Sequence, residues 1–360
     1  MLHGESLAVP TAAPGRSQAE HSLGEMRTAL ALYRSAESGQ WESVWDDAPA
    51  PMLTQSPIID THQHLWDLSK LKLGWLETVP DLQRSYTPED YRLHTEGLGI
   101  ERTVYAEVEV DADQKALEVE VVSGYCDDPA LPTAAMIASA DPATLKSAPP
   151  AWLDSAASVR AVRWGIHFQP QGVCLGEEFV AGVQALGEKG KAFEICIRPA
   201  ELADAAALAR AAPGTQMVLC HCGNADPNVV NGADPGEPPV PQPQTDDATY
   251  HTWHTAEGWK KDITALAACP NVVCKLSGII SRVKEGWSAQ TLLPTLNYCI
   301  DAFGADRCMF GGDWPLCTLG AGGTTSYADW ARVIRLAVAP RSMAEQRKIL
   351  YGNAVRVYGL

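Results

Sequence analysis

Two histidines stand one residue apart at the end of a short apolar run. His62 and His64 follow Ile58 and Ile59, with Asp60 before them. Because side chains alternate along a strand, both histidines are expected on the same face of the strand. Asp60 is expected on that face too, one position farther from the open end of the strand. Two neighbouring imidazoles at the open end of a buried strand can bind a divalent metal or an oxygen-rich ligand. The alternative is a pair of loop histidines that only hydrogen-bond to backbone.

Polar residues also end most of the later apolar runs. They include carboxylates, cations and a third histidine: Glu107, Glu109, Arg163, Glu194, His221, Lys275, Ser277 and Asp313. Arg160 and Arg163 are three residues apart and face opposite sides of an ideal strand, so only Arg163 is expected to join such a site.

Eight short apolar runs alternate with helical patterns across about 300 residues. The first run begins at Ile58, and the others span Thr103–Val110, Thr133–Ala138, Val159–Trp164, Phe193–Ile197, Gln216–His221, Asn271–Leu276 and Cys308–Gly312. In the second, Tyr105, Glu107 and Glu109 are expected to share one face. The alternation predicts a (β/α)₈ TIM barrel, whose active site forms at the carboxyl ends of its strands. A doubly wound open sheet is the alternative, but no Gly-x-Gly-x-x-Gly turn follows the first strand.

Helices are expected between and after these strands. Thr87 should cap a helix that begins at Pro88. Further helices are predicted over residues 111–126, 177–187, 201–212, 257–268, 292–303, 327–338 and 342–351.

Two segments are expected to lie outside the regular barrel. Residues 1–56 form an N-terminal extension, with a disordered start and a helix from Gln18 to Gly39, and residues 57–360 form the barrel domain. Asn224–Thr249 contains six prolines and four aspartates and has no Lys or Arg. We predict that it is neither helix nor strand but a long loop on the active-site face, which either shapes the pocket or only decorates it.

The composition narrows the classes of partner. The formal net charge is −16, and 46% of the 360 residues are hydrophobic. Nucleic acids and anionic membranes attract clustered Lys and Arg, so a small-molecule substrate is expected instead. No apolar stretch approaches the ~18 residues of a membrane span, and no secretory leader is recognisable. We expect a cytoplasmic protein, and the sequence leaves open whether it forms a homo-oligomer.

The ten cysteines are interpreted as thiols. Cys196, Cys220, Cys274 and Cys308 lie inside apolar runs, where Cys acts as a small buried hydrophobe in a reducing compartment. His221 lies between Cys220 and Cys222, but no second Cys pair of zinc-finger spacing follows.

Several motifs together resemble the amidohydrolase-2 branch of the amidohydrolase superfamily, and within it the sugar-acid lactonases of the L-fuconolactonase type. The likeness covers residues 57 to 360 and rests on Ile59–Asp67, Gly74–Leu76, Tyr86–Asp90, Val159–Arg163, Asn271–Gly278, Met309–Pro315, Gly352–Ala354 and Tyr358–Leu360. The resemblance implies a (β/α)₈ barrel in which water attacks a carbonyl or lactone. It also implies that Asp313 is the general base, with His62, His64 and His221 around the same point.

The sequence departs from the family pattern in two places. After the sixth strand, Cys220–Asn224 reads Cys-His-Cys-Gly-Asn where the family usually has Asp-His-Leu-Gly-Lys. The histidine is kept and the lysine is not, so the resemblance does not establish the substrate of this chain. The fifth strand offers Glu194 and Cys196 where metal-dependent members carry a histidine.

Lactone hydrolysis needs an activated water, stabilisation of the oxyanion and a proton for the leaving alkoxide. Asp313 is the candidate for both proton transfers; its alternative role is to cap the next helix. His62, His64, His221 and Asp313 are the candidate ligands for one divalent metal, zinc or manganese. In a metal-free mechanism the histidines would donate hydrogen bonds to the substrate carbonyl.

Four further residues are candidates for binding substrate: Arg163, Lys275, Glu107 and Trp66. The two cations suit a carboxylate, hydroxyl groups or the oxyanion. Their alternative is a salt bridge to Glu107, Glu109 or Glu194 across the barrel mouth.

The sequence therefore predicts a hydrolase that opens a lactone ring of a sugar acid or related carboxylated lactone. The alternatives are a metal-dependent decarboxylase of the same superfamily and a non-catalytic, metabolite-binding barrel. An idle barrel has no physical need for four converging polar groups, which favours an enzyme.

Overall fold

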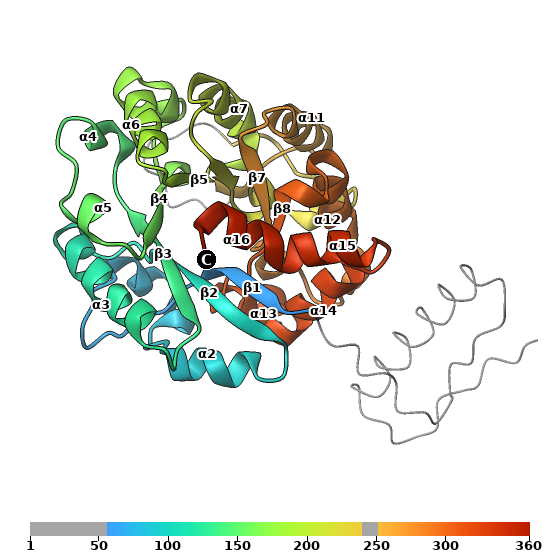
Figure 1. Cartoon of the computed structure of the whole chain (residues 1–360). Coiled ribbons are helices and arrows are strands. Elements are labelled where there is room, and N and C mark those ends of the chain that lie inside the picture. Colours follow the sequence, from blue (N-terminus) through green and yellow to red (C-terminus); the bar gives the residue numbers. More distant parts are fainter. Residues whose placement is uncertain (1–55, 240–250) are drawn as a thin grey trace, which may run out of the picture. The chain divides into compact units, whose positions relative to one another are not determined.

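The computed structural model describes residues 56–239 and 251–360. The predicted N-terminal helix, the disordered start and the last part of the proline-rich insertion lie outside these ranges. Eight parallel strands form one sheet in the order β1 to β8, surrounded by helices (Figure 1). The strands are β1 Ile58–Gln63, β2 Ile100–Ala106, β3 Thr133–Ser139, β4 Val159–Gly165, β5 Ala192–Cys196, β6 Met217–Leu219, β7 Val272–Leu276 and β8 Cys308–Phe310.

The ring closes just beyond the last strand. The backbone N–H of Asp313 donates to the carbonyl of His62 at 2.7 Å, and the backbone N–H of His64 donates to the carbonyl of Trp314 at 2.8 Å. The predicted (β/α)₈ barrel is confirmed, and the open-sheet alternative is wrong.

Helices follow most strands, as the alternation predicted. The longer ones are α2 Pro88–Thr95, α3 Lys115–Asp127, α6 Glu177–Glu188, α7 Leu202–Ala211, α11 Ala256–Ala267, α12 Ala289–Phe303 and α14 Tyr327–Val338. The short ones are α4 Pro142–Leu145, α5 Trp152–Ser155, α8 His221–Asn224, α9 Pro227–Val230, α13 Gly320–Gly323, α15 Met343–Arg347 and α16 Asn353–Tyr358. Thr87 caps α2 as predicted, since its side chain accepts from the backbone of Asp90. None of these helices is long and apolar enough to cross a membrane.

The hydrophobic core has two layers. An outer layer packs the strands against the helices. A smaller inner layer fills the barrel with side chains such as Ile59, Val104 and Ile137, and Ala354 and Tyr358 of α16 belong to it. Because Asn353 donates to the carbonyl of Cys308, where β8 begins, α16 closes the barrel at the amino ends of the strands (Figure 1).

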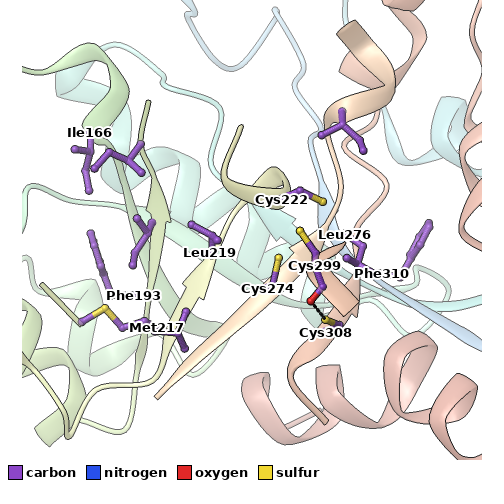
Figure 2. Packing of buried hydrophobic residues seen from close by; sticks show 14 of the residues in the cluster. Ile166, Phe193, Met217, Leu219, Cys222, Cys274, Leu276, Cys299, Cys308 and Phe310 are labelled. Carbon is purple, nitrogen blue, oxygen red and sulfur yellow. Dashed lines mark hydrogen bonds between the residues drawn. The ribbon is translucent and has the colours of Figure 1, made fainter. Parts of the chain in front are cut away.

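All ten cysteines are free thiols, as predicted, and nine of them are buried. Figure 2 shows Cys222, Cys274, Cys299 and Cys308 packed near Leu276 and Phe310 in the outer layer. The sulfur atoms of the first three lie within 4.8 Å of one another. Their surroundings are apolar, so we interpret them as packing residues.

Three local expectations are wrong. Asp60 does not share the face of the histidines: its carboxylate accepts from Tyr91 of α2 and Tyr327 of α14, because the pairing with β2 shifts register after Asp60. Tyr105 does not share a face with Glu107, because β2 ends at Ala106 and its regular alternation ends there. Within the proline-rich insertion, residues 227–230 do form a short helix, α9, which begins at a proline and is capped by the Asp226 side chain.

Candidate active site

Asp313 lies at the centre of a group of three histidines. Its Oδ1 is 3.5 Å from Nε2 of His64 and 3.7 Å from Nε2 of His62, and its Oδ2 is 4.0 Å from Nδ1 of His221. These residues come from the loop after β8, the end of β1 and the loop after β6. The structure thus brings together all four predicted catalytic and metal-binding residues.

The Asp313 carboxylate is buried yet incompletely hydrogen-bonded. The residue is 4% exposed, and Oδ1 has no hydrogen-bond partner among the residues that the structure describes. Burial by itself raises the pKa of Asp313, but His221 and His64 outweigh it, so that the pKa is lower than usual. The group is therefore a carboxylate at neutral pH, with an oxygen atom that can accept a proton.

Backbone strain accompanies the placement of these residues. Asp313 has φ +55° and His221 has φ +53°, both in the left-handed region that residues other than glycine rarely adopt. Glu109, three residues after the end of β2, has φ +49°. Such conformations persist only where the surrounding fold holds them, and they cluster at functional sites.

His62 is enclosed by charged groups. Its Nδ1 is 3.2 Å from Nζ of Lys275, and its Nε2 is 3.3 Å from Nη1 of Arg163. Burial lowers its pKa well below the usual value, and the nearby Lys275, His221, His64 and Arg163 lower it further. His62 therefore stays a neutral imidazole over the working pH range.

His64 and His221 are each oriented by a partner on the ring. Nδ1 of His64 is 2.9 Å from the carbonyl oxygen of Ala106, which orients Nε2 toward Asp313. Nδ1 of His221 is 2.9 Å from the hydroxyl of Ser277. Gly278 lies directly against this ring, since a Cβ built there would be 2.4 Å from His221 Nδ1.

Arg163 faces the barrel interior, as predicted, and is paired with a carboxylate. Its Nε donates to Oε1 of Glu107 at 2.6 Å, and its Nη2 donates to the Glu107 carbonyl at 2.7 Å. Nη1 remains directed toward His62. The charge of Glu107, together with burial, raises the pKa of the neighbouring Glu109 to about 7.

Lys275 is completely buried beneath the histidines. Its Nζ donates to both oxygens of Glu194, at 2.7 and 2.8 Å. The salt-bridge alternatives considered for Arg163 and Lys275 are thus both present in the structure. Lys275 contacts the site through His62.

Trp66 lies in an aromatic cluster at the side of the barrel. It packs against Trp75 and Tyr86, and its indole N–H donates to the carbonyl of Arg84 at 2.6 Å. Its 2% exposure makes it a supporting residue in this structure. Its predicted contact with substrate remains a prediction.

Sequence reasoning missed Arg282, at the end of the 3₁₀ turn η7 (Ile279–Arg282) after β7. Its guanidinium donates to the backbone carbonyl of Asn224 and lies 3.4 Å from the Asn224 side-chain oxygen. Burial lowers its pKa, while the charges of Asp226, Cys196 and Asp313 act on it in the opposite direction. Arg282 lies six residues after the end of β7. At that distance the alternation of side chains along the strand no longer predicts where the side chain points.

His62, His221 and Asp313 each offer a ligand atom, and these atoms lie within 4.8 Å of one another. The surroundings of His62, however, do not suit a bound ion. Metal-binding imidazoles need an unprotonated nitrogen, with the other nitrogen donating to an acceptor. His64 meets this requirement. His62 does not, because its two nitrogens face Lys275 and Arg163, which are donors only. An ion on His62 Nε2 would also lie beside the Arg163 guanidinium.

The chain is similar to known proteins along most of its length. Residues 59–360 match the family model described as amidohydrolase. An L-fucono-1,5-lactonase from Burkholderia multivorans is 28% identical over 318 residues, covering 84% of this chain and 96% of that protein.

Two crystal structures of an amidohydrolase from the same species share the fold. One, with bound HEPES, has a TM-score of 0.69 at 24% identity, and one with bound zinc has 0.66 at 23%. Each alignment covers 84% of this chain and 99% of the other. Metal dependence is typical of the superfamily. Since the family model spans most of the chain, the chain belongs to the amidohydrolase family and is an enzyme of the hydrolase class.

Proposed function

We propose that the enzyme opens the lactone ring of a sugar acid or related carboxylated lactone, with water activated by Asp313. The observation that carries the proposal is the buried Oδ1 of Asp313, which faces the Nε2 atoms of two histidines and lacks a hydrogen-bond partner within residues 56–239 and 251–360. The related L-fucono-1,5-lactonase supports the reaction class.

The proposed reaction needs two proton transfers, both at Asp313. Oδ1 removes a proton from water as the oxygen attacks the lactone carbonyl carbon, which gives a tetrahedral oxyanion. The C–O bond of the ring then breaks, and Asp313 returns the proton to the leaving alkoxide. The product is the open hydroxy acid, and Asp313 is again a carboxylate.

The oxyanion needs donors that are already in place. We place the carbonyl oxygen next to Nη1 of Arg163 and Nε2 of His62, which are 3.3 Å apart. Arg163 is held by two bonds to Glu107, so its remaining N–H groups need no reorganisation during the reaction.

We assign recognition of a substrate carboxylate to Arg282. Arg163 and Lys275 each have a carboxylate partner at 2.6 to 2.8 Å. Arg282 has no carboxylate within 4.0 Å in the described part of the chain, and its guanidinium contacts the neutral Asn224. A largely buried guanidinium with neutral partners and within electrostatic reach of Asp313 suits an incoming anion.

We further propose that the reaction proceeds without a metal ion. The positive charges that a Lewis acid would supply are already present in Arg163 and Lys275, on either side of His62. The histidines then serve as hydrogen-bonding groups around the substrate carbonyl and the water.

The test is proton release from a panel of aldonolactones and dicarboxylic-acid lactones, with Asp313→Asn and Asp301→Asn compared with the parent. Asp313→Asn is expected to lower kcat by roughly 10² to 10⁴. Asp301→Asn, which changes an exposed carboxylate paired with Arg341, should leave it unchanged. Parental turnover by Asp313→Asn would exclude the assigned base. Carbon dioxide release from an aromatic acid, without lactone hydrolysis, would instead support a decarboxylase.

A further inference from the structure

The carboxyl-terminal motif contains a buried tyrosine that the proposed reaction does not use. Tyr358 lies on α16, which closes the barrel at the end opposite the active site. It is 1% exposed, and its hydroxyl donates a 2.5 Å hydrogen bond to Oε1 of Glu194 inside the barrel. Glu194 is itself fully buried.

Glu194 connects this tyrosine to the active site through Lys275. Both carboxylate oxygens accept from the Lys275 ammonium, and the thiol of Cys220 donates to Oε2 at 3.3 Å. The ammonium group has three N–H donors and no acceptor. Nδ1 of His62 lies 3.2 Å from the same ammonium nitrogen and can accept its third N–H.

Two donors compete for the single lone pair of a neutral His62. Lys275 approaches Nδ1, and Nη1 of Arg163 approaches Nε2 at 3.3 Å. Lys275 is 0% exposed, so loss of its contact with His62 would leave a buried N–H without a partner. Arg163 is 8% exposed, so water or a substrate oxygen can accept from its guanidinium. The lone pair therefore belongs on Nδ1 and the hydrogen on Nε2.

We propose that Tyr358 is a positioning residue: through Glu194 and Lys275, it holds His62 in the form that carries hydrogen on Nε2. In this form, Nε2–H of His62 and Nη1–H of Arg163 can both donate to one substrate oxygen. The assignment of that oxygen to the lactone carbonyl rests on the proposed function. The position of the hydrogen on His62 does not.

The Tyr358 hydroxyl fixes the position of Glu194, because a buried carboxylate is oriented by the groups that donate hydrogen bonds to it. Tyr358 is the donor to Glu194 that comes from the closed end of the barrel. Without it, Oε1 retains the Lys275 contact alone. The Glu194–Lys275 pair can then tilt, which lengthens the 3.2 Å contact to His62 and weakens the preference for hydrogen on Nε2.

A matched control is available in Tyr105. Its hydroxyl donates at 2.8 Å to Oε1 of Glu118, another fully buried acidic side chain, which lies on α3 and whose pKa burial raises to about 8. Tyr105→Phe and Tyr358→Phe therefore remove the same kind of hydrogen bond. They differ in whether the carboxylate contacts the active site.

The deciding measurement is nitrogen NMR of the full chain labelled at histidine, which reports the hydrogen position on each ring without any substrate. The parent is expected to show His62 with hydrogen on Nε2. Tyr358→Phe should shift the His62 nitrogen signals toward a mixture of the two forms, whereas Tyr105→Phe should leave them unchanged. In a Glu194→Gln/Lys275→Met background, which removes both buried charges together, Tyr358→Phe should have no further effect.

Kinetics provide the second measurement. Tyr358→Phe is expected to lower kcat about 5- to 10-fold with KM unchanged, while Tyr105→Phe changes neither. Hydrogen on Nδ1 in the parent, or identical His62 signals in Tyr358→Phe and the parent, would overturn the inference. Expected NMR signals with no lactone turnover by the parent would refute the proposed function and leave this inference standing.

Discussion

The backbone N–H of Asp313 donates a 2.7 Å hydrogen bond to the carbonyl of His62. The contact joins the two ends of the sheet and also brings the candidate base against the histidine pair. Asp60 supports the same junction, since its Oδ1 accepts from the backbone of Gly312 at 2.6 Å and of His62 at 2.8 Å. Closure of the barrel and assembly of the site therefore depend on the same few atoms.

His62 should make the stability of the fold depend on pH. Its pKa is well below the usual value in the folded protein because of burial and nearby cations. Below about pH 6.5 the unfolded chain binds a proton that the folded chain does not. Stability is therefore retained above that pH and falls as the pH decreases, by at most about 1.4 kcal/mol per pH unit for one group.

The measurement for His62 is the free energy of unfolding from pH 5 to pH 8. His62→Gln should reduce the loss of stability on acidification, and His94→Gln, which changes an exposed histidine, should not. Equal pH slopes for the parent and His62→Gln would contradict the prediction.

Arg282 should distinguish charged from neutral substrates. Arg282→Gln is expected to raise KM for carboxylated lactones roughly 10- to 100-fold, in line with the ~1.5–3 kcal/mol of a hydrogen bond to a charged group. KM for neutral lactones should change little. Arg356→Gln, on the exposed side of α16, is the control. An equal change for both substrate classes would remove Arg282 from carboxylate recognition.

Removal of metal ions should leave turnover intact. A neutral His62 has one lone pair, and its ring nitrogens face the donor-only groups of Lys275 and Arg163, which compete with a divalent ion for it. We expect kcat after extended dialysis against a chelator to match the untreated enzyme. Loss of activity that zinc or manganese restores would show that the enzyme requires a metal ion.

Much of the site can be predicted from the sequence, because the active site of a barrel enzyme forms at the carboxyl ends of its strands. His62, His64, His221 and Asp313 each stand at or just after a strand end, and parallel strands bring those ends to one rim. The inward direction of Arg163 also follows from alternation, since β4 is regular from Ala161 onward.

The errors occur where the backbone departs from ideal strands. Asp60 faces α2 and α14 because of a register shift in β1, and Tyr105 turns away from Glu107 because β2 ends between them. Neither irregularity has a local signal in the residues themselves. Lys275 is buried beneath His62 and pairs with Glu194, which also accepts from Tyr358. These contacts join residues that are distant in sequence, so local patterns do not predict them. Arg282 belongs to a 3₁₀ turn, which alternation does not describe.

Gly278 should be required for activity because its lack of a side chain makes room for His221. It has φ +73°, and a Cβ there would be 2.4 Å from Nδ1 and 2.6 Å from Cγ of the His221 ring. Gly278→Ala must displace this ring, which would break its 2.9 Å contact with Ser277 and move it relative to Asp313. We expect kcat to fall about 100-fold or more, since misplacement of a catalytic group by about 1 Å costs that much.

Gly286 provides the matched control for this change. It has φ +78°, but a Cβ there would have no atom within 4 Å. Gly286→Ala therefore imposes the same backbone strain, about 1 to 3 kcal/mol, without touching the site. Both variants should lose stability in thermal unfolding, Gly278→Ala more than Gly286→Ala because it also displaces His221, and Gly278→Ala alone should lose activity. Equal turnover in the two variants would mean that the position of the His221 ring is not critical for the reaction.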